Sequence, residues 1–236
     1  MPTTKGVLDK INGIDLSYYP FAEVQELIRS LGKNSSLIFT LHYGKILTRA
    51  RPGRGYTQIS ELSYLPQDKN TKCQRASTPN KTMFYGTLVQ EGESLDKARM
   101  IAASECSSLL RSVVDTKGIE KITYGRWSVL KDINLVVILD EEIYAESPTN
   151  PLLTELKKAY SKFIGTVPDI EDNVKQISNF FAKEFSKDDI KNDYDYFISA
   201  VFTEVIKMTM VMMELCILLL EQVDSGVLML LLNLKL

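Results

Sequence analysis

Two periods of hydrophobic and polar positions occur along this 236-residue chain. Apolar residues recur every three or four positions over 16–32, which is typical of an amphipathic helix, and Gly32 ends the pattern. Short runs of β-branched and aromatic residues are typical of strands. We predict helices over 16–32, 95–113, 151–186 with a break at 165–168, and 194–206. We predict two short strands joined by a turn within 35–47, and further strands over 82–89, 121–129 and 133–140.

This order of elements predicts an α/β (α+β) fold with a mixed β-sheet core and flanking helices. We divide the chain into an N-terminal helical extension (1–35), a central domain (36–206) and an apolar tail (207–236). Residues 49–80 show little periodicity. A loop of this length inside a compact domain is usually functional or disordered.

The composition narrows the classes of function. The formal charge of −2 gives no general attraction to nucleic acid. The N-terminus lacks an apolar signal region, and the three cysteines form no CxxC pair, so we expect a cytoplasmic protein with reduced thiols. A single histidine, His42, excludes a His-rich metal site. We therefore expect no metal, no nucleic-acid partner and no membrane partner.

Three arginines, Arg49, Arg51 and Arg54, follow a predicted strand and enter a glycine-containing loop. Guanidinium groups bind phosphate oxygens in a bidentate manner. These three arginines could therefore form a clamp for a pyrophosphate. The alternative is a solvated basic turn, because runs of charge usually face solvent.

A second candidate begins at Arg75, which precedes a polar turn and a strand that contains Phe84 and Tyr85. An aromatic side chain at the end of a strand can stack on a flat ligand ring. The alternative is that Phe84 or Tyr85 packs in the core.

Glu105 is the third candidate. Helical spacing places it on one face with Ala98, Ile101 and Ala102, so it points toward the core. A carboxylate there is costly unless it is paired or functional. The alternative is a structural ion pair with Arg49 or Arg75. We interpret the neighbouring Cys106 as a buried, inert thiol.

Four segments in this order resemble the RES-domain family, which is named for its Arg, Glu and Ser residues. The segments are ILTRARP, ISELSYLP, QRASTPNKTMFYG and AASECSSL, and the resemblance covers roughly 38–206. It implies an ADP-ribosyltransferase-like fold with a mixed β core around a cleft. Characterised members are NAD-degrading toxins of bacterial toxin–antitoxin pairs, which release nicotinamide by hydrolysis or phosphorolysis.

The resemblance also assigns roles to residues. Arg49 and Arg75 look like the family's two arginines, Tyr85 like its strand tyrosine and Glu105 like its helix glutamate, with Glu91 and Glu93 as alternatives. The arginines would hold the pyrophosphate of NAD, and the tyrosine would stack on a ring of the dinucleotide. The glutamate would stabilise the oxocarbenium-like ribose or orient the attacking water or phosphate.

The apolar tail departs from the family pattern. RES-domain proteins carry their serine in a C-terminal strand, and the tail contains no such segment; Ser199 lies on a predicted helix and does not match it. Glu214, Glu221 and Asp224 interrupt the apolar run, so it does not suit a membrane span. We expect a C-terminal apolar helix in place of the last strand. We also expect weak or no activity.

The resemblance thus predicts an impaired NAD-degrading enzyme with NAD as its substrate. A cognate antitoxin protein is the partner that it implies, and a homo-oligomer is left open. Two alternatives remain. One is a non-enzymatic module that binds a protein through its apolar tail, and the other is a transferase that attaches ADP-ribose to a protein.

We hypothesise that a frameshift near 203–208 produced the tail. Shifting the frame of the codons for 213–236 allows GIMYPSVGTGGFG followed by NVAIKP, which is the family's expected ending. We therefore expect the coding DNA, read in the shifted frame, to contain Tyr-Pro-Ser codons, with the serine codon across those for Leu218 and Leu219. Nucleotide sequencing of this region checks it, and a shifted frame without these codons rules the hypothesis out.

Overall fold

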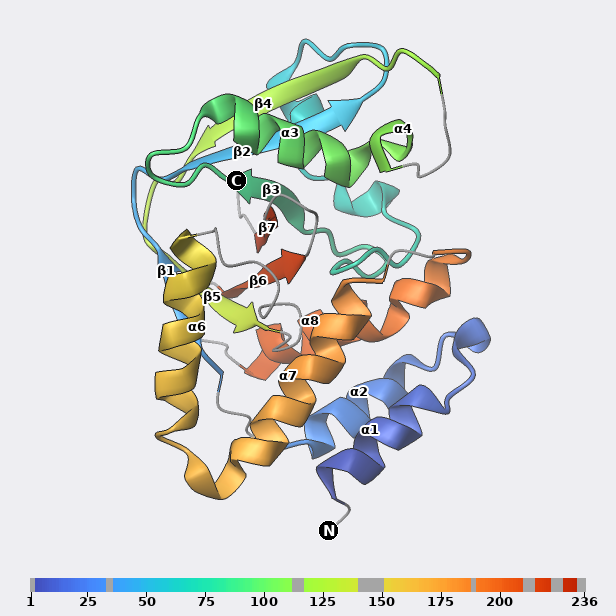
Figure 1. Cartoon of the computed structure of the whole chain (residues 1–236). Helices are drawn as coiled ribbons and strands as arrows, with labels where there is room; N and C mark the ends of the chain where they lie inside the picture. The colour runs from blue at the N-terminus through green and yellow to red at the C-terminus, as the bar shows by residue number, and fades with distance from the viewer. Residues whose placement is uncertain are drawn as a thin grey trace.

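The computed structural model describes residues 3–32, 36–111, 117–139, 151–187, 190–209, 215–221 and 227–232. Its described strands form one seven-stranded sheet with helices packed around it (Figure 1). The predicted mixed α+β class is therefore confirmed. The ends of the predicted helix 95–113 and strand 133–140, and parts of the tail 207–236, lie outside the described residues.

The sheet has the strand order β1-β5-β6-β7-β3-β2-β4. Only β5 and β6 run parallel among these neighbours. The two strands predicted within 35–47 are β1 and β2, joined by a turn at Gly44 with φ +82°. They do not pair with each other, because β1 pairs with β5 whereas β2 pairs with β3 and β4. The strands are β1 (Ile38–Leu41), β2 (Ile46–Pro52), β3 (Phe84–Leu88), β4 (Ile122–Ser128), β5 (Ile133–Ile138), β6 (Leu215–Glu221) and β7 (Val227–Leu232).

The helices broadly follow the predicted apolar periods. They are α1 (Thr4–Asn12), α2 (Phe21–Ser30), α3 (Leu95–Cys106), α4 (Ser108–Arg111), α6 (Pro151–Ile164), α7 (Glu171–Phe185) and α8 (Phe197–Thr209). The predicted helix 16–32 is shorter, because Tyr19, with φ +55°, and Pro20 interrupt the chain before α2. Helix α1 was not predicted, although Val7, Leu8 and Ile11 have helical spacing and are buried.

Two hydrophobic cores lie on opposite faces of the sheet. Along β5, Val136 and Ile138 belong to one core, whereas Leu135 and Val137 belong to the other. This alternation follows from the two-residue period of a strand. The first core also contains apolar residues of α1, α2, α7 and α8, and the second contains those of α6. Residues of the predicted N-terminal extension thus share a core with helices of the central domain (Figure 1).

The expectation of an apolar helix in place of the last strand was wrong. The tail contributes β6 and β7, which lie in the middle of the sheet between β5 and β3. Their pairings include Leu135 with Cys216 and Tyr85 with Leu231. A run of Leu, Ile and Val without a polar period is compatible with a buried strand as well as with a buried helix, so the local pattern did not decide between them. The backbone of β3 is therefore paired with β7 of the tail, and the backbone of β5 with β6.

Removal of 210–236 tests the central position of these strands. We expect the truncated chain to lose cooperative unfolding, because β3 and β5 would each lose a paired neighbour in the interior of the sheet. Circular dichroism during urea denaturation measures this, with the full-length chain as the control. A truncated chain that unfolds as cooperatively as the full-length chain would show that β6 and β7 do not hold the sheet together.

Candidate functional site

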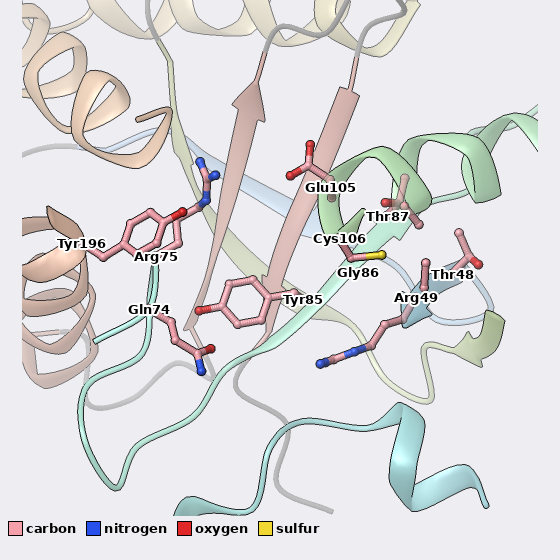
Figure 2. Close-up of a pocket in the computed structure, with 12 residues that line it drawn as sticks. Thr48, Arg49, Gln74, Arg75, Tyr85, Gly86, Thr87, Glu105, Cys106 and Tyr196 are labelled. Carbon is pink, nitrogen blue, oxygen red and sulfur yellow. The ribbon is translucent and has the colours of Figure 1, made fainter. Parts of the chain in front are cut away.

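Four of the predicted site residues meet at one pocket, whereas Arg51 lines its neighbour. This first pocket has a volume of about 290 Å³ and lies between β2, β3, α3, the segment before β3 and the short helix Asp193–Tyr196. Arg49, Arg75, Tyr85 and Glu105 all line it (Figure 2). Its other described lining residues are Thr48, Ala50, Gln74, Gly86, Thr87, Ala102, Cys106 and Tyr196. Arg49 and Glu105, which are 56 positions apart in the sequence, therefore line the same pocket.

Arg49 extends from β2 into this space. Its guanidinium carbon lies 5.1 Å from the centre of the Phe84 ring, a cation–π contact. Its Nη1 atom is buried and has no hydrogen-bond partner among the described residues. Burial lowers the pKa of Arg49 to about 10, so the side chain still carries a positive charge at neutral pH. A buried cation with an unused donor is suited to an anionic ligand.

Side-chain contacts hold the segment 70–83 in place. The Asn70 side chain donates to the carbonyl oxygen of Thr78 at 2.6 Å, and isolated β-bridges join Gln74 to Ser77 and Thr78 to Lys81. Lys81 also forms a 2.5 Å ion pair with the buried carboxylate of Glu204 on α8. This part of the long predicted loop is therefore ordered, and it fixes the position of Arg75.

Arg75 is buried and donates to the carbonyl oxygen of Phe185 at the end of α7. Its guanidinium carbon also lies 5.5 Å from the centre of the Tyr196 ring. Arg75 thus links the pocket to α7 and to the short helix before α8. Tyr196, which lines the pocket, was missed by the sequence analysis, although it belongs to an aromatic and acidic cluster, DYDYF.

Tyr85 lies between Arg75 and Arg49 in the view of Figure 2. Its hydroxyl accepts a hydrogen bond from the backbone N–H of Ala76 at 3.1 Å and is 3.0 Å from Oγ of Ser77. Burial raises the pKa of Tyr85, although these hydrogen bonds oppose the shift, and the phenol is neutral at physiological pH. Core packing, the alternative for these aromatics, holds for the fully buried Phe84. Tyr85 packs against the edge of the first core and also lines the pocket.

Helix α3 carries Glu105 to the pocket. Ser94 caps the helix, accepting from the N–H of Lys97 at 3.2 Å, and Ala98, Ile101 and Ala102 are buried. Glu105 is half-buried one residue before the end of the helix. The alternatives Glu91 and Glu93 instead form ion pairs with Lys45 and Lys97, respectively. Cys106 was expected to be buried, but it is half-buried and lines the pocket.

Arg51 and Arg54 differ from Arg49 in their contacts. Arg51 lines a neighbouring pocket, donates to the carbonyl oxygen of Glu61 and lies 4.3 Å from the centre of the Tyr56 ring. Arg54 forms a 2.9 Å ion pair with the Glu61 carboxylate. The alternative of a solvated basic turn thus describes Arg54, which is 79% exposed.

The described residues also bear on other kinds of site. They contain no group of three His, Cys, Asp or Glu side chains that could hold a metal ion. None of the described helices has the length and apolar character needed to cross a bilayer. Comparisons of the chain with protein-family models, curated proteins and solved structures gave no match. A function is therefore proposed below from the geometry of the site and from the family resemblance of the sequence.

The two pocket arginines should differ in their effect on stability. Replacing Arg49 with Met removes a desolvated charge, and we expect the free energy of unfolding to stay unchanged or to rise by up to about 2 kcal/mol. Arg75→Met is the matched comparison, because it leaves the buried carbonyl of Phe185 without this donor and should cost about 1–3 kcal/mol. Urea denaturation measures both. An Arg49→Met variant that loses more stability than Arg75→Met would contradict this assignment.

Proposed function

We propose that this chain cleaves the bond between nicotinamide and ribose in NAD, as RES-domain enzymes do. The observation that supports this most strongly is the first pocket, which gathers Arg49, Arg75, Tyr85 and Glu105. These are the four residues that the family resemblance assigns to the NAD site. They come from a strand, a loop, a second strand and a helix, so their convergence does not follow from their proximity in the sequence.

In this proposal Arg49 binds the pyrophosphate of NAD. Its buried Nη1, which has no hydrogen-bond partner among the described residues, supplies a donor, and the positive charge offsets the charge of the phosphates. Arg75 donates to the Phe185 carbonyl and adds positive potential to the wall of the pocket. The neutral ring of Tyr85 provides a flat surface against which a ring of the dinucleotide can stack.

Glu105 supplies the negative charge that the reaction needs. As the C–N bond breaks, its electron pair goes to the positively charged pyridinium, which leaves as neutral nicotinamide. The ribose then carries oxocarbenium character, which a nearby carboxylate stabilises. Attack by water at the anomeric carbon gives ADP-ribose and releases one proton, which Glu105 can accept. Phosphate in place of water would give ADP-ribose 1″-phosphate.

The family resemblance also suggests a cellular role. We propose a cytoplasmic toxin whose cognate antitoxin is a protein partner. The chain lacks the family's C-terminal Tyr-Pro-Ser segment, so we expect slower turnover than in RES-domain proteins that contain it. If the frameshift hypothesis is correct, a chain with the restored frame should release nicotinamide faster.

A carboxylate substitution tests the reaction. We expect Glu105→Gln to lower the rate of nicotinamide release from NAD by about 100-fold or more, because the neutral amide neither stabilises the cation nor accepts a proton. Glu93→Gln is the matched control, since Glu93 pairs with Lys97 and should leave the rate unchanged. Chromatographic measurement at high protein concentration suits a slow enzyme.

Two results would contradict the proposal. One is equal rates for Glu105→Gln and the wild-type chain. The other is the absence of nicotinamide release from both the wild-type chain and the chain with the restored frame. NAD labelled in its adenosine half separates free ADP-ribose from label attached to protein, which would indicate the transferase alternative.

A further inference from the structure

A second pocket adjoins the first. It has a volume of about 580 Å³ and shares Arg49, Ala50, Gln74, Tyr85 and Cys106 with the first pocket. Its other walls come from β2, from the segment 60–69 and from the residues just before β3. A ligand that passes Arg49 and Tyr85 could therefore occupy both pockets at once.

Two buried hydroxyl groups in this second pocket lack partners. Ser63 and Thr82 line the pocket, and their exposed fractions are only 8% and 7%. Neither hydroxyl oxygen has a hydrogen-bond partner among the described residues. Buried hydroxyls are costly when unpaired, and most buried polar groups in proteins are paired. Because each group turns about a single side-chain bond and can both donate and accept, a ligand with hydroxyl or ring-nitrogen groups could satisfy both.

Part of the remaining wall is apolar and suits the base of a nucleoside. Tyr64, Leu65, Pro66 and Met83 provide apolar surface suited to a flat base. Glu61 also lines the pocket, and hydrogen bonding from the backbone of Gln58 is the main cause that lowers its pKa. Its carboxylate is therefore ionised, but it pairs with Arg54, and the cations Arg51 and Lys69 also line the pocket. The apolar surface, rather than charge repulsion, is what favours a nucleoside here.

We propose that the second pocket binds the adenosine half of the dinucleotide. The base lies against Tyr64 and Met83, and the sugar or base edge bonds to the hydroxyls of Ser63 and Thr82. Arg49, in the wall that the pockets share, meets the pyrophosphate, and the first pocket receives the nicotinamide ribose. This inference rests on the proposed function, because the dinucleotide substrate supplies the ligand for the second pocket.

Binding of the two halves of NAD tests this assignment. Isothermal titration of the full chain with AMP, nicotinamide mononucleotide and inorganic phosphate compares three probes. We expect Ser63→Ala and Thr82→Val each to weaken AMP binding by about fivefold and to leave nicotinamide mononucleotide binding unchanged. Thr166→Val, at an exposed hydroxyl that donates to Phe163, is the control and should bind AMP as the wild type does.

These variants should fold, because each removes a buried hydroxyl that has no partner among the described residues. The inference is overturned if AMP does not bind, or if both variants bind AMP as tightly as the wild type. Binding of inorganic phosphate alone, weakened by Thr82→Val, would overturn it in favour of an anion pocket. Nicotinamide release reports separately. If neither the wild-type chain nor the chain with the restored frame releases nicotinamide but AMP binding depends on Thr82, NAD cleavage is refuted and the pocket assignment is supported. If the chain releases nicotinamide and both Ser63→Ala and Thr82→Val bind AMP as the wild type does, NAD cleavage is supported and the pocket assignment is overturned.

Discussion

The candidate site depends on the charged guanidinium of Arg49, whose Nη1 atom is buried and donates to none of the described residues. Desolvation of this group lowers its pKa to about 10, a shift that disfavours the charged form without removing the charge at neutral pH. The contact with the Phe84 ring offsets part of the cost. An anionic ligand would accept a hydrogen bond from the Nη1 atom of Arg49 and neutralise its charge. Because Arg49 lines both pockets, we treat the two pockets as one binding region.

The rest of the structure places partners around that charge. Pairing of β2 with β3 brings Arg49 and Tyr85 onto neighbouring strands, and α3, packed on both, brings Glu105 to the pocket. Arg75 is fixed differently, by the ordered segment 70–83 and by its bond to the Phe185 carbonyl. Because β7 pairs with β3, the sheet that supports Tyr85 also depends on the apolar tail. The tail therefore matters to the site through the sheet, whatever its origin in the gene.

Part of this arrangement could be predicted from the sequence. At these positions the hydrophobic period identified the helix or strand, and the residue type identified the chemistry. Glu105 on an apolar helical face and Tyr85 at a strand were identified from such patterns, and the structure places both at the first pocket. The tail was misjudged because a continuous Leu-rich run does not distinguish a buried strand from a helix. Long-range pairing decides that choice, and it is not encoded in local spacing. Ser63, Thr82 and Tyr196 were missed for the same reason: they become pocket residues only when distant segments meet.

A crystal structure of the full chain with ADP-ribose tests this site most directly. We expect pyrophosphate oxygens within hydrogen-bond distance of the Arg49 guanidinium, adenosine in the second pocket and the terminal ribose in the first, with its anomeric carbon facing Glu105. A ligand bound elsewhere on the protein, or an Arg49 guanidinium whose nitrogens are all satisfied by protein groups, would contradict this expectation.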